Sequence, residues 1–88
     1  MPEVFLVWEI YIDFLAPAAT EIKLVAIFAD EKAAIDLMEL RVKNHRQNVP
    51  KPPPTYQVNY KVQGWKLGEP DPDKSSRDIK VEHVWPMP

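Results

Sequence analysis

The chain has 88 residues, which is enough for one small domain with a thin hydrophobic core. Its formal net charge is -2, and this balance argues against a dedicated nucleic-acid-binding protein, which usually carries a basic excess. It contains no cysteine, so disulfides, thiolate metal ligands and thiol catalysis are excluded.

The N-terminal segment is apolar, but it lacks the features of a secretory signal or a membrane span. No lysine or arginine precedes its apolar run, and Glu3, Glu9 and Asp13 interrupt it. We therefore expect a soluble, cytoplasmic protein that makes no contact with a membrane.

Residues 4–14 predict a long central strand. The even positions, from Val4 to Phe14, are all apolar, whereas the odd positions are mixed. Because side chains alternate across a strand, the even positions line one sheet face without a polar break.

Residues 21–29 alternate in the same way and predict a second strand, and Pro17 marks the reversal between the two. One face of this second strand holds Ile22, Leu24, Ala26 and Phe28, and the other holds Lys23, Val25 and Ile27. The two runs with their short link predict an antiparallel hairpin.

A helix is predicted from about residue 31 to residues 44–47. Asp30 is a suitable N-cap, since its carboxylate can accept the free N–H groups of the first turn. Ala34, Leu37, Met38 and Val42 recur at helical spacing, and this apolar stripe is expected to pack on the hairpin.

Four prolines between residues 50 and 54 end the helix and permit two interpretations. The letters PPTY at residues 53–56 match a polyproline docking peptide. However, Tyr56 begins the strand alternation that continues through Val58 and Tyr60, so a stiff crossover from helix to sheet is favoured.

Residues 55–67 predict a half-buried strand with one wet face, and Gly64 shifts its parity, which predicts a bulge. A polar, proline-broken loop follows. Residues 79–85 alternate again and predict a possible fourth strand.

These elements predict an α+β fold, in which one helix packs on one face of an antiparallel sheet of three or four strands. Residues 1–68 form the predicted β-β-α-β core domain. Residues 69–88 form a polar loop and a C-terminal strand or tail of the same domain.

The sequence offers no group of residues suited to catalysis, and we expect a protein that is not an enzyme. His45 and His83 lie in different predicted elements, and no cysteine is present to act as a nucleophile. Asp71 and Asp73 lie in a loop without the ligand spacing of a calcium site. We therefore predict no catalytic residue, no cofactor and no metal.

Two surfaces are candidate contact sites. A single helix covers only one sheet face, so the other face is expected to be an exposed apolar interface. Its predicted residues are Phe5, Val7, Tyr11, Val25 and Ile27. A second copy of the chain, a host protein, or the C-terminal tail with Val84 or Trp85 would cover it. We therefore predict a non-enzymatic protein-binding module whose partner is a second copy, a host protein or both, with a structural homodimer without further activity as an alternative.

The second surface is the basic helix end, which could contact phosphates of a nucleic acid. The residues concerned are Arg41, Lys43, Arg46 and Lys51. Positive charge that complements the helix dipole explains the same residues more simply, so nucleic-acid binding is the weaker alternative.

The segment "IFADEKAA" (residues 27–34) and the strand "YQVNYKVQGWKL" (residues 56–67) resemble a group of small bacterial and phage proteins with a β-β-α-β core. The resemblance spans residues 4–67, and the proline linker and tail depart from it. It implies a phage or mobile-element accessory protein, such as an anti-CRISPR-like inhibitor that occupies the surface of a host protein.

Overall fold

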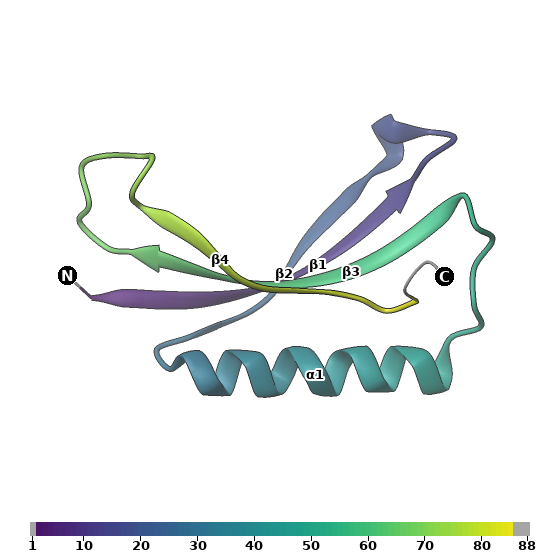
Figure 1. Cartoon of the computed structure of the whole chain (residues 1–88), viewed down its shortest axis with the longest axis horizontal. Coiled ribbons are helices and arrows are strands. Elements are labelled where there is room, and N and C mark those ends of the chain that lie inside the picture. The colour runs from purple at the N-terminus through teal and green to yellow at the C-terminus, as the bar shows by residue number, and fades with distance from the viewer. Residues whose placement is uncertain (1, 86–88) are drawn as a thin grey trace.

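One antiparallel sheet and one helix make up the fold in this computed structural model, which describes residues 2–85. Its elements are β1 (Glu3–Asp13), a short 3-10 turn η1 (Pro17–Ala19), β2 (Glu21–Phe28), α1 (Glu31–Asn48), β3 (Tyr56–Lys66) and β4 (Ser76–His83). The strand order is β2-β1-β3-β4, and α1 packs along one side of the sheet (Figure 1). The α+β prediction is confirmed, and the fourth strand is part of the sheet.

The helix forms for the local reasons that the sequence shows. The Asp30 carboxylate accepts a hydrogen bond from the Ala33 N–H at 3.1 Å and so caps the first turn. Ala34, Met38 and Val42 follow one another at four-residue spacing, and all three are buried against the sheet. The helix ends at Asn48, one residue beyond the predicted range.

The register of β3 decides which face of β1 the helix covers. Val58 and Val62, buried in β3, lie opposite Tyr11 and Val7 of β1. The buried residues of β3 therefore lie beside the odd positions of β1, and α1 packs on this side of the sheet. The uninterrupted apolar row at the even positions of β1 faces away from the helix.

An irregularity in β2 changes which of its side chains point away from the helix. Val7 pairs with Ala26, whereas the next residue, Trp8, pairs with Leu24, so Val25 is an extra residue. The predicted strict alternation of β2 is therefore wrong. Beyond this bulge, Ile27 lies opposite Leu6 and joins Leu24 on the helix-free side.

The bulge predicted at Gly64 is also wrong. The β1–β3 register runs without interruption through Gly64, which lies opposite Phe5. A Cβ at Gly64 would lie 2.6 Å from a carboxylate oxygen of Glu3. That carboxylate accepts two hydrogen bonds from Arg77, at 2.9 and 3.0 Å, so the glycine makes room for an ion pair that joins β1 to β4.

The proline segment leads directly from α1 into β3. The Tyr56 N–H donates to the Pro53 carbonyl at 3.0 Å, which closes a turn just before the strand. The Tyr56 side chain is half-buried against the core, and its ring centroid lies 6.2 Å from that of Tyr11. This placement supports the interpretation of the segment as a crossover.

Candidate protein interface on the helix-free sheet face

The predicted apolar interface lies mostly on the wrong face. Phe5 and Val7 are only 8% and 0% exposed, because they form the core beneath α1. Tyr11 and Val25 are half-buried against that core, and of the five predicted residues only Ile27 points away from the helix. The physical reason is the register of β3, which brings the odd positions of β1 under the helix.

The other side of the sheet carries an apolar surface that we term the open face. Its apolar members are Val4, Leu6, Trp8, Ile10 and Ile12 of β1, Ile22, Leu24 and Ile27 of β2, Trp65 of β3 and Val81 of β4. Ile22 and Ile27 of β2 are the most accessible of these, at 62% and 59% exposed. In β1 the even positions are intermediate, since their neighbours on both sides shield them.

The described part of the C-terminal tail packs on the helix side of the sheet. Val84 is 0% exposed and belongs to the core beneath α1. The Trp85 ring packs edge-on against His45 of α1, with 5.3 Å between centroids. The tail cover that the sequence allowed therefore does not occur within residues 2–85, and Met87 lies outside the described residues.

Charged side chains divide unequally between the two sides of the sheet. The four strands contain eleven charged residues, and the strand registers place nine of them on the helix side. The two on the open face are Lys61 and Asp78, whose Nζ and Oδ1 atoms lie 3.4 Å apart. The open face thus combines an apolar surface with no uncompensated charge.

Two tryptophans on the open face share one hydrogen-bond acceptor. The indole N–H groups of Trp8 and Trp65 both donate to the side-chain oxygen of Gln63, at 3.1 and 2.8 Å. The amide thereby links the two rings, of which Trp65 is 37% exposed and Trp8 is half-buried. Tryptophan dominates the energetics of many protein interfaces, because its large ring loses little conformational entropy on binding.

The β1–β2 connection extends the apolar surface beyond the strands. Phe14 is 53% exposed and Leu15 is 79% exposed at the hairpin tip. Figure 1 shows that this hairpin and the β3–β4 hairpin, at opposite ends of the sheet, both bend away from α1. The hairpin tip therefore rises on the side of the open face.

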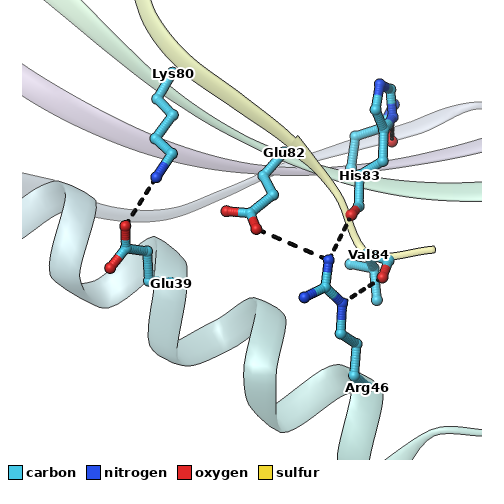
Figure 2. Close-up of polar contacts among 7 residues, drawn as sticks. Glu39, Arg46, Lys80, Glu82, His83 and Val84 are labelled. Atoms are coloured by element: carbon cyan, nitrogen blue, oxygen red, sulfur yellow. Dashed lines mark hydrogen bonds and ion pairs between the residues drawn. The ribbon is translucent and has the colours of Figure 1, made fainter. Parts of the chain in front are cut away.

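One residue of the basic helix end, Arg46, forms contacts that stabilise the fold. Arg46 donates from Nε to the Val84 carbonyl and from Nη2 to the His83 carbonyl at 3.0 Å, and it lies 3.8 Å from Glu82 (Figure 2). Nearby, the Lys80 ammonium donates to Glu39 at 2.8 Å. Arg46 thus clamps β4 to α1.

Among the residues predicted to contact phosphates, only Arg46 has this internal role. The other three are exposed, namely Arg41, Lys43 and Lys51. An arginine bound to two carbonyls is poorly placed to hold a phosphate, so the clamp weakens the nucleic-acid alternative.

A cleft of mixed polar and apolar lining lies between the C-terminal half of α1 and the sheet strands β1 and β3, with a volume of about 460 Å³. At its base the Tyr60 hydroxyl donates to the Glu9 carboxylate, and His45 Nδ1 lies 3.4 Å from that hydroxyl. Leu37 and Leu40 of α1 form its apolar rim. His45 also packs on Trp85.

Glu9 couples stability to pH. Burial alone raises the pKa of Glu9, but the hydroxyls of Tyr11 and Tyr60 and the nearby charges lower it further than burial raises it, so the pKa falls below its ordinary 4.5. The ionised carboxylate therefore stabilises the folded state above about pH 4.5, and this contribution is lost as the pH falls through the lowered value.

We expect the difference in unfolding free energy between wild type and Glu9→Gln to shrink as the pH is lowered below 4.5. Urea titrations across a pH series measure this difference. Glu21→Gln, at an exposed carboxylate on β2, is the matched control. A Glu9 variant whose stability stays parallel to wild type at every pH would contradict the linkage.

Within residues 2–85, no three histidine, cysteine or acidic side chains come together as a metal-binding group. In the same range, no helix is both long and apolar enough to cross a membrane. Comparison with protein-family models, with curated proteins and with solved structures found no match.

Proposed function

We propose that the chain is a non-enzymatic protein-binding module and that the open face is its binding surface. The observation that carries this proposal is the segregation of charge. Nine charged strand residues lie on the helix side, whereas the open face has only the Lys61–Asp78 pair. Such a face has the composition of a surface that another protein covers, since charge is depleted at interface cores.

Energetic considerations support the same choice. Apolar surface removed from water contributes about 25 cal/mol per Å², and the open face offers several half-exposed large side chains side by side. Contiguous patches of this kind on small proteins usually mark an interaction site. The pair Trp8 and Trp65 supplies the anchors around which such an interface is built.

An inhibitory role is part of this proposal. Where the partner of the open face is a larger protein, the chain would inhibit that protein by covering part of its surface. That the larger protein belongs to a bacterial host, and that the chain is a phage or mobile-element accessory protein, rests on the sequence resemblance alone.

Site-specific cross-linking tests the proposed function. The chain has no cysteine, so Leu24→Cys and Leu40→Cys each give one site for a benzophenone label. Leu24 lies on the open face at 45% exposure, and Leu40 lies on α1 at 53% exposure. In extract from the cell of origin, we expect adducts from the Leu24 label that unlabelled wild type suppresses and unlabelled Leu24→Glu does not.

The Leu40 label serves as the control for nonspecific capture. Equal adducts from both positions, or adducts that Leu24→Glu suppresses as well as wild type does, would refute the open face as the binding surface. The mass of the adduct distinguishes another protein from a second copy of the chain.

A further inference from the structure

We infer that the occupant of the open face is a second copy of the chain, in a two-fold symmetric dimer whose two sheets pack face to face with the helices outside. This inference rests on the proposed function, because it names the partner of the same surface. Three properties of the open face favour a second copy: its charge, its shape and its area.

Charge is the first property. In a two-fold dimer the same patch meets itself, so any net charge on the patch would be repeated across the interface and would repel. Within its four strands the open face avoids this repulsion, since its one cation there, Lys61, and its one anion there, Asp78, neutralise each other within the same subunit. A foreign partner would impose no such requirement.

Shape is the second property. A twisted sheet is a saddle, and here the two hairpin ends rise at opposite ends of the sheet on the open-face side (Figure 1). A saddle rotated by half a turn about an axis in its own plane coincides with itself. Two copies of the same twisted face therefore fit together closely, as the sheets of a β-sandwich do.

The distribution of apolar residues selects the direction of the axis. The apolar half of the open face lies on β1 and β2, whereas β3 contributes mainly Gln57, Asn59 and Gln63. An axis that runs across the strands places β1 over β1 and β2 over β2. The two apolar halves then meet, and the hairpin tip with Leu15 lies over the partner's β2 near Ile27.

Area is the third property. β2 and β4 each have eight residues, and four strands at about 4.8 Å spacing with about 3.3 Å rise per residue give a flat footprint of about 500 Å². Two such footprints bury about 1,000 Å², which is the minimum for a specific interface, before the side chains and hairpin tips add to it.

Light scattering across a dilution series tests the dimer. We expect wild type to show twice the chain mass of 10.2 kDa at high concentration and to approach 10.2 kDa on dilution. Leu24→Glu and Ile27→Glu should show the monomer mass throughout, while the matched variant Leu40→Glu keeps the wild-type behaviour. Circular dichroism on each variant establishes that it is folded.

The possible results distinguish a failure of the dimer from a failure of the proposed function. A wild-type mass of 10.2 kDa at every concentration overturns the dimer, as does a folded Leu24→Glu or Ile27→Glu variant that still dimerises. If the same wild type forms Leu24-specific adducts with another protein, the proposed function stands and only its second-copy form fails. Absence of any specific adduct together with a monomeric mass overturns both.

Discussion

Replacing Phe5 by alanine is expected to lower the free energy of unfolding by about 3–5 kcal/mol, because it leaves a cavity in a core that cannot collapse around it. Phe5 is 8% exposed beneath α1, although it belongs to the odd positions of β1, which combine apolar and charged residues. Urea unfolding at a protein concentration where light scattering shows the monomer measures this loss.

Leu24→Ala is the control for the Phe5 substitution. Leu24 is 45% exposed on the open face, so its truncation in the monomer is expected to change stability by only about 0.5 kcal/mol. A larger loss from Leu24→Ala than from Phe5→Ala would mean that the helix covers the even positions of β1, and the open face would then be misassigned.

The Arg46→Ala substitution is expected to cost about 1.5–3 kcal/mol, the range for hydrogen bonds to a charged group. It leaves the carbonyls of His83 and Val84 without their donor, and it removes the ion pair with Glu82. The end of β4 should loosen first. Hydrogen exchange of the Val84 amide, which donates to the Val58 carbonyl at 3.0 Å, is expected to accelerate more than exchange in β1.

Two further variants separate the clamp from a general effect of charge. Arg46→Lys keeps the charge but lacks the planar fork that reaches both carbonyls, so we expect it to recover only part of the stability. Lys43→Ala removes an exposed charge one turn earlier and should change stability by about 0.5 kcal/mol or less. Equal losses from Lys43→Ala and Arg46→Ala would remove the case for the clamp.

Local signals in the sequence were sufficient to predict the helix and the presence of the strands. Asp30 and the spacing of Ala34, Met38 and Val42 determine the start and the inward face of α1. Alternation identifies the presence of the four strands, although β4 spans Ser76–His83 instead of the predicted residues 79–85, and the proline segment identifies the crossover. Each of these features depends on neighbours within a few residues, so periodicity and capping reveal them directly.

The choice of sheet face depended on information that no single segment contains. The even row of β1 is the more apolar, and on its own it is the better candidate for a core. The helix packs on the odd row because β3 pairs with Val62 opposite Val7, and an antiparallel register between distant strands is not visible in either strand alone. In addition, the bulge at Val25 reverses the side of the sheet to which the following residues of β2 point.

The candidate site was missed for the same reason, although one signal was present. In β1, all three charges occupy odd positions, namely Glu3, Glu9 and Asp13. Comparing charge between the two parities of β1 and of β2 would have identified the side that lacks charge, whereas β3 has one lysine at each parity. The clamp at Arg46 had no such signal, since its partners are backbone carbonyls that the sequence does not distinguish.

The dependence of the covered face on β3 has a consequence for the order of assembly. Residues 1–48, which are synthesised before β3, contain the β1–β2 hairpin and α1 but lack Val58 and Val62, which complete the core on the odd side. Until β3 pairs, the more apolar even row competes for the helix. Two packings of the helix on the β1–β2 hairpin then compete, and the pairing of β3 with β1 selects one of them.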